Sequence, residues 1–134
     1  MISKGKAISL HKAFSGLEVA THRTPESKDI QDAFCQLAEY RDGGIFLAHY
    51  AGNSDWERHP DDEMVMVIEG QTMVFLLQDE VEQAHPLQQG ELIVVPKNTW
   101  HRFESPEVVK IMTVTPQPTD HSIRFPEITN NPAV

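Results

Sequence analysis

The chain has 134 residues, 40% of them hydrophobic, so it is long and apolar enough for one domain with one core. Its formal net charge is −9 without a basic stripe, which argues against nucleic-acid binding, and no apolar run approaches the roughly 20 residues that span a membrane. The first ten residues lack the apolar run of a secretory leader, and a single cysteine, Cys35, cannot form an internal disulfide. We therefore expect a cytoplasmic protein that neither binds nucleic acid nor crosses a membrane, with residues 1–134 as one domain.

Short apolar runs separated by turn residues follow one another along the chain, which is typical of an all-β sandwich or barrel. Residues 6–20 are expected to form one or two peripheral strands, and residues 22–32 a loop. Residues 32–40 are compatible with a helical turn or a strand. The glycines within residues 41–44 predict a hairpin turn, since glycine supplies positive φ, and a strand should follow over residues 45–50.

The second half of the chain continues this pattern. Strands are expected over five further ranges: 63–68, 72–77, 92–95, 100–103 and 108–115. Residues 78–83 are predicted to be a polar turn, and Pro96 should end the strand that precedes it. Residues 117–134 are polar and contain prolines, so we expect a tail that is anchored, if at all, by three apolar side chains: Ile123, Phe125 and Ile128.

Four candidate metal ligands surround two predicted turns. Glu57 and His59 are two residues apart on a strand, so their side chains share one face. The turn at residues 60–62 reverses the chain and lets Glu63 face the same space. His101 comes from another hairpin. Two carboxylates and two imidazoles suit a divalent ion such as Fe, Mn, Zn or Ni, although the residues do not decide which one.

These candidates lie in two runs whose spacing resembles the two sequence motifs of the cupin family. The spacing agrees at three residues of the first motif and four of the second: His59, Glu63 and Gly70, then Gly90, Pro96, Asn98 and His101. The two runs together cover residues 52–105. The resemblance implies a double-stranded β-helix, which is a jelly-roll barrel, often dimeric and with a metal deep inside.

Three residues depart from the family's pattern. Glu57 stands where the family has its first metal-binding histidine, Asn98 replaces a glycine, and Ser105 replaces an asparagine. The last two positions are structural, and we expect Asn98 to adopt a left-handed conformation in its tight turn. Glu57 changes the site itself. It is either a fourth ligand, or a base or supporting residue beside a set of two histidines and one carboxylate.

The function that follows is a metal-binding barrel acting on a small polar molecule. The metal would hold and polarise a substrate oxygen, in an isomerase, dioxygenase or hydrolase type of reaction, with Glu57 or Glu63 as the proton-transfer group. Five further residues are expected to line the pocket or the adjoining core: His49, Tyr50, Phe75, Phe103 and Met112.

The alternative function is a non-catalytic barrel that holds a metal or a small molecule as a sensor. An enzyme should have an open metal position facing a polar pocket, whereas a sensing site should be closed. In either case we expect a homodimer, because exposed strand edges tend to pair.

Overall fold

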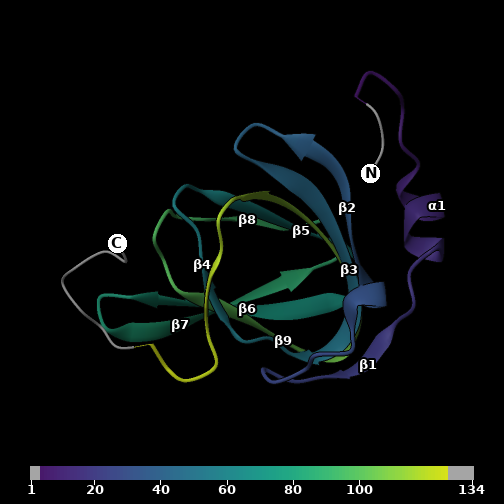
Figure 1. Cartoon of the computed structure of the whole chain (residues 1–134). Helices are drawn as coiled ribbons and strands as arrows, with labels where there is room; N and C mark the ends of the chain where they lie inside the picture. Colours follow the sequence, from purple (N-terminus) through teal and green to yellow (C-terminus); the bar gives the residue numbers. More distant parts are fainter. Residues whose placement is uncertain (1–3, 127–134) are drawn as a thin grey trace.

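The structure is a computed structural model that describes residues 4–126, and most of these residues lie in strands that curl around a common interior (Figure 1). The strands are β1 (Ala20–Arg23), β2 (Phe34–Tyr40), β3 (Gly43–Asn53), β4 (Trp56–Arg58), β5 (Glu63–Glu69), β6 (Gln71–Gln78), β7 (Val81–Gln88), β8 (Leu92–Val95), β9 (His101–Pro116) and β10 (Asp120–Ser122). The helical segments are α1 (Leu10–Ser15) and the 3₁₀ turn η1 (Gln31–Ala33). The expectation of an all-β fold is confirmed.

The long strand β9 organises the barrel. On one side its residues 104–116 pair antiparallel with β3, with one irregularity opposite Tyr50 and Gly52. On the other side its first residues pair with β6 and its last residues with β5. The outer strands β2, β8 and β7 then pair with β3, β5 and β6 respectively. Because β9 belongs to both halves of the barrel, its inward side chains face residues from most of the other strands.

Alternation along the strands fills the interior with apolar side chains. Val65 and Val67 on β5, Val74 on β6, and Val109 and Ile111 on β9 are all at most 2% exposed. Burying side chains of this size stabilises the fold by about 1.5–3 kcal/mol each.

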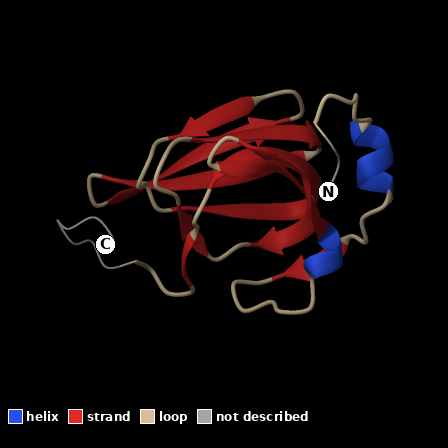
Figure 2. Cartoon of the chain, turned by 45° about the horizontal axis from the view of Figure 1, so that its top comes forward, coloured by secondary structure: helices blue, strands red, loops and turns tan. Residues whose placement is uncertain are grey.

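The helix α1 covers part of the outer face of the barrel beside β3 (Figures 1 and 2). Strands were expected over residues 6–20, and that expectation was wrong for α1, because Leu10, Phe14 and Leu17 recur at helical spacing and pack together against Leu47 of β3. The Ser9 side chain caps the helix by accepting a hydrogen bond from the N–H of Lys12 (3.2 Å). Neither helical segment in the described part of the chain is long and apolar enough to cross a membrane.

The predicted hairpin at residues 41–44 is confirmed, but its glycines have another role. Positive φ falls on Arg41 (51°) instead of on a glycine. Gly43 is needed because a Cβ there would lie 1.9 Å from the carbonyl oxygen of Thr115. The left-handed conformation expected for Asn98 is confirmed, with φ 57°.

Other differences concern the extent of strands. Residues 32–40 contain η1 and then β2, and the two strands expected over 100–103 and 108–115 are the single strand β9. The polar turn expected over 78–83 is reduced to Asp79 and Glu80, both with positive φ, after which β7 begins.

Residues 120–122 also differ from expectation, since they form β10 and pair with β4 instead of belonging to a tail. Phe125 is anchored against Trp56, with 5.4 Å between the ring centroids. Ile128 lies outside the described residues.

Candidate metal and ligand site

Three of the four predicted metal ligands come together inside the barrel. His59 follows β4, Glu63 begins β5 and His101 begins β9, so a turn and a long-range strand pairing converge at one point. One ligand atom from each residue lies within 4.8 Å of the other two. The three residues are 3%, 4% and 1% exposed.

Neighbouring groups hold both imidazoles with Nε2 toward the cluster. His101 donates from Nδ1 to the backbone carbonyl of Thr99 (3.0 Å). Thr119 Oγ1 donates to Gln117 (3.2 Å), so its oxygen is free to accept a hydrogen bond from Nδ1 of His59 (3.1 Å). In this arrangement each Nε2 is a bare acceptor.

The carboxylate of Glu63 completes a cluster of electron-rich atoms. Its Oε2 accepts a hydrogen bond from Thr115 (2.6 Å), and its Oε1 lies 3.0 Å from Nε2 of His101. Yet Oε1 and both Nε2 atoms are buried without a hydrogen bond of good geometry. Buried acceptors facing one another are unfavourable unless a proton or a cation lies between them, so the residues present fit a divalent metal.

The electrostatics of the cluster point the same way. Burial acts to raise the pKa of Glu63, but the adjacent imidazoles of His101 and His59, whenever they carry a proton toward it, outweigh burial and lower that pKa to about 2. Burial acts to lower the pKa of His101, but Glu63 and then Glu57 raise it overall. The cluster therefore retains an anionic carboxylate, which a metal ligand must have.

Glu57 does not belong to this group. It pairs with His101 across β4 and β9, but its carboxylate turns toward Arg23, with 3.9 Å between Oε1 and Nη2. Burial raises the pKa of Glu57, and the charge of Glu63 adds to this effect, while His101 opposes it. The geometry thus departs from the four-ligand set and favours the alternative with two histidines and one carboxylate.

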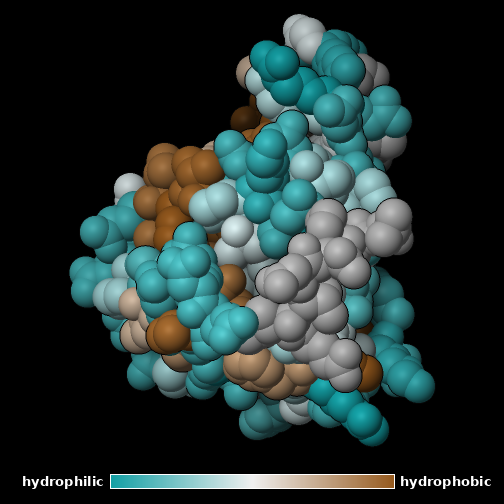
Figure 3. All heavy atoms as spheres, turned by 90° about the vertical axis from the view of Figure 1, so that its left-hand side faces the viewer, coloured by the Kyte–Doolittle hydropathy of each residue, from teal (hydrophilic) through white to brown (hydrophobic). Residues whose placement is uncertain are grey.

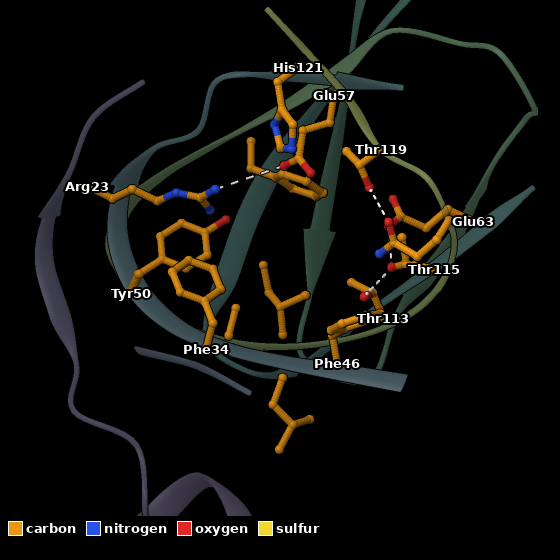
Figure 4. A pocket seen from close by; sticks show the side chains of 15 residues that line it. Arg23, Phe34, Phe46, Tyr50, Glu57, Glu63, Thr113, Thr115, Thr119 and His121 are labelled. Carbon is orange, nitrogen blue, oxygen red and sulfur yellow. Dashed lines mark hydrogen bonds and ion pairs between the residues drawn. The ribbon is translucent and has the colours of Figure 1, made fainter. Parts of the chain in front are cut away.

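A cavity of about 280 Å³ adjoins Glu63 and opens between the barrel strands. Figure 4 shows Arg23 and Tyr50 on one side of it, Glu63, Thr115 and Thr119 on the other, and Glu57 with His121 between them. Of the five residues expected to line the pocket or the adjoining core, Tyr50 and Phe103 line this cavity.

The other three residues lie elsewhere because side chains alternate along a strand. His49 precedes the inward-facing Tyr50 and packs edge-on against Phe14 under α1. Met112 follows Ile111 and belongs to the same outer cluster. Phe75 lies under the guanidinium of Arg102, which is 4.0 Å from its ring centroid.

Several pocket residues lie outside the predicted site. Arg23 falls in the range expected to be a loop and His121 in the range expected to be a tail, and the prediction does not include the three threonines within residues 113–119. The alternation of Thr113 and Thr115 with Val114 on a core strand is a signal that could have revealed a polar inner wall. Nothing local distinguishes Arg23 or His121, because their positions depend on strand pairing with β3 and β4.

The barrel and its cluster of two histidines and one glutamate define a cupin-type protein. A family model described as a cupin domain matches residues 46–115, just over half of the chain. The chain therefore belongs to the cupin family, as its two motifs predicted.

Comparison with individual proteins agrees with this assignment. An uncharacterized protein of Bacillus subtilis (strain 168) is 33% identical over 70 residues, which are 52% of this chain and 59% of that protein. The crystal structure of a cupin-2 domain protein from Shewanella frigidimarina has a TM-score of 0.61 at 29% identity, covering 82% of this chain and 94% of that one. A hydroquinone 1,2-dioxygenase solved with Cd²⁺ and 4-hydroxybenzonitrile has a TM-score of 0.54 at 20% identity, covering 62% and 63%.

Proposed function

We propose that this protein is a metal-dependent cupin that holds a divalent cation at His59, Glu63 and His101 and acts on a small molecule bound in the adjoining pocket. The observation that carries this proposal is the set of buried, unpartnered acceptor atoms that face one another from three separate elements. Two histidines and one carboxylate leave positions for substrate or water on Fe, Mn, Zn or Ni, as open catalytic sites require.

When bound, the metal would supply Lewis-acid polarisation of a substrate oxygen. The residues of the chain divide the remaining tasks. Thr115, Thr119 and the carbonyl of Thr99 orient the three ligands. Glu57 faces the pocket as a carboxylate outside the ligand set, so it is the better placed of the two predicted proton-transfer residues.

The cavity beside Glu63 favours an enzyme over a closed sensing site. A storage or sensing site would have its metal sealed by protein side chains, whereas here a cavity of about 280 Å³ adjoins a ligand residue. The isomerase, dioxygenase and hydrolase types remain within the proposal. We also propose a homodimer in solution.

The test is metal analysis of protein purified without an affinity tag and then reconstituted with each candidate ion. We expect near-stoichiometric metal in the wild type and its loss in His101→Ala and in the isosteric Glu63→Gln. Glu57→Gln should retain the metal, as should His85→Ala, which removes a histidine outside the cluster. Circular dichroism would verify that each variant is folded.

Two results would contradict the proposal. One is the absence of metal from the reconstituted wild type. The other is unchanged metal content in a folded His101→Ala or Glu63→Gln protein.

A further inference from the structure

The end of the pocket away from Glu63 is built around Arg23. Its guanidinium lies over the rings of Tyr50 and Phe34, with Cζ 4.6 Å and 4.9 Å from their centroids. The two rings stack on each other at 6.1 Å with an interplanar angle of 22°. These contacts fix the guanidinium plane while its N–H groups remain available at the edge.

Three polar groups at this end lack hydrogen-bond partners. Among residues 4–126 the side chains of Arg23 and Glu57 make no hydrogen bond of good geometry, and the 3.9 Å between them is too long for one. The Tyr50 hydroxyl is fully buried near Arg23 and Ser105, and it lacks a hydrogen bond of good geometry to either. Burial raises the pKa of Tyr50 although Arg23 and Ser105 oppose it, so this hydroxyl keeps its proton as a donor.

These groups face the same space from different sides. Figure 4 shows Arg23 and the Tyr50 hydroxyl on the side opposite Glu63, with Glu57 above them. Phe34, Phe46 and Phe103 supply flat apolar walls. A cavity of about 280 Å³ lies just below the usual range of about 300–1,000 Å³ for ligand pockets, so the occupant is small.

We propose that this end of the pocket binds a neutral group that presents a carbonyl oxygen and an N–H donor side by side, as a carboxamide does, on a small planar molecule. The carbonyl would accept from Arg23 and Tyr50, and the N–H would donate to Glu57. This inference deepens the proposed function by naming a class of substrate, and it rests on that function only in placing the rest of the molecule toward the metal ligands.

The charges at this end distinguish such a group from its competitors. Arg23 offers N–H donors and Glu57 offers carboxylate oxygens 3.9 Å away, so the pair matches a group that presents an acceptor and a donor side by side. A carboxylate ligand would satisfy the two donors, but it would set its own oxygens against those of Glu57 and offer them no donor. A neutral ketone would leave Glu57 unpartnered in the same way.

The experiment is titration of the metal-loaded wild type with three probes of nearly equal shape, benzamide, benzoate and acetophenone, followed by NMR chemical shifts. We expect benzamide to bind at least about tenfold more tightly than either other probe, which corresponds to about 1.4 kcal/mol. Tighter binding of benzoate, equal binding of all three, or no binding at millimolar concentrations would overturn the inference.

Variants of the two charged residues sharpen this test. Arg23→Gln should weaken the binding of benzamide about tenfold, because a charge-assisted hydrogen-bond donor is lost. Glu57→Gln should bind benzoate more tightly than the wild type does, and so narrow the difference in affinity between benzamide and benzoate. Arg41→Gln is the matched control, since Arg41 also lies over a tyrosine ring, that of Tyr40, but outside the pocket. Unchanged benzamide binding in Arg23→Gln would overturn the inference.

Metal content, measured on the same samples, separates the two proposals. If the wild type binds no metal but keeps the Arg23-dependent preference for benzamide, the metal proposal fails and this inference stands. If the metal is bound and the preference is absent, only this inference fails.

Discussion

The Thr119 hydroxyl determines which ring nitrogen of His59 is free to bind another group. It connects Nδ1 of His59 to Gln117 and so leaves Nε2 as the free acceptor. Groups of this kind fix the tautomer and orientation of a ligand histidine, and losing one commonly costs 10–100-fold in metal affinity.

We therefore predict that Thr119→Val, which keeps the shape and removes the hydroxyl, weakens metal binding by about 10–100-fold. Competition with a chelator of known affinity would measure it. Thr21→Val is the control, because Thr21 is an exposed residue of β1. Equal affinity in Thr119→Val and the wild type would show that His59 is oriented without this bond.

At the scale of elements, the short strand β1 brings Arg23 to the pocket, and Gly52 of β3 leaves room for the close approach of the two strands. Strands β1 and β3 run parallel with Arg23 opposite Gly52, which has φ +116°. A Cβ on Gly52 would lie 2.1 Å from the carbonyl oxygen of Arg23. The glycine that opens the first motif region thus has a local steric reason to be glycine.

Gly52→Ala should accordingly destabilise the protein by about 3 kcal/mol or more, since steric overlap adds to backbone strain. Gly90→Ala is a matched control, because Gly90 also has positive φ (84°) but no atom within 4 Å of the added Cβ. That variant should lose only about 1–2 kcal/mol. Urea unfolding of both proteins would compare them, and equal losses would contradict the steric argument.

At the scale of the molecule, hydrophobic side chains are not confined to the interior. Figure 3 shows them gathered in the upper left of the face that it presents. On β8, Leu92 and Val94 are 54% and 52% exposed, and they lie opposite Met66 and Met64 of β5. These four residues form an outer apolar face beside a strand that pairs only with β5 in the described part of the chain.

An apolar face at an unpaired strand is suited to a second copy of the barrel. We predict that the wild type is a dimer in light scattering and that Val94→Asp is a folded monomer. Val81→Asp is the control, since Val81 is equally exposed, at 57%, but lies on β7. A monomeric wild type, or a dimer that survives Val94→Asp, would contradict this prediction.

Short-range patterns in the sequence were enough to predict the fold class and to relate two residues of the cluster, His59 and Glu63, to each other. His59 and Glu63 flank a tight turn, so alternation and reversal of the chain define their relation. His101 required the resemblance to a family, because its distance in sequence from the other two carries no geometric information. The hairpins and the turn at Asn98 followed from local residue preferences in the same way.

Only the tertiary structure decided what surrounds that cluster. Glu57 lies two residues before His59 in the sequence, yet its carboxylate turns to Arg23, whose position comes from the parallel pairing of β1 with β3. Thr119 reaches His59 because β10 pairs with β4. Such pairings depend on burial and register over the whole chain. The alternation of side chains along a single strand indicates only which residues share a face.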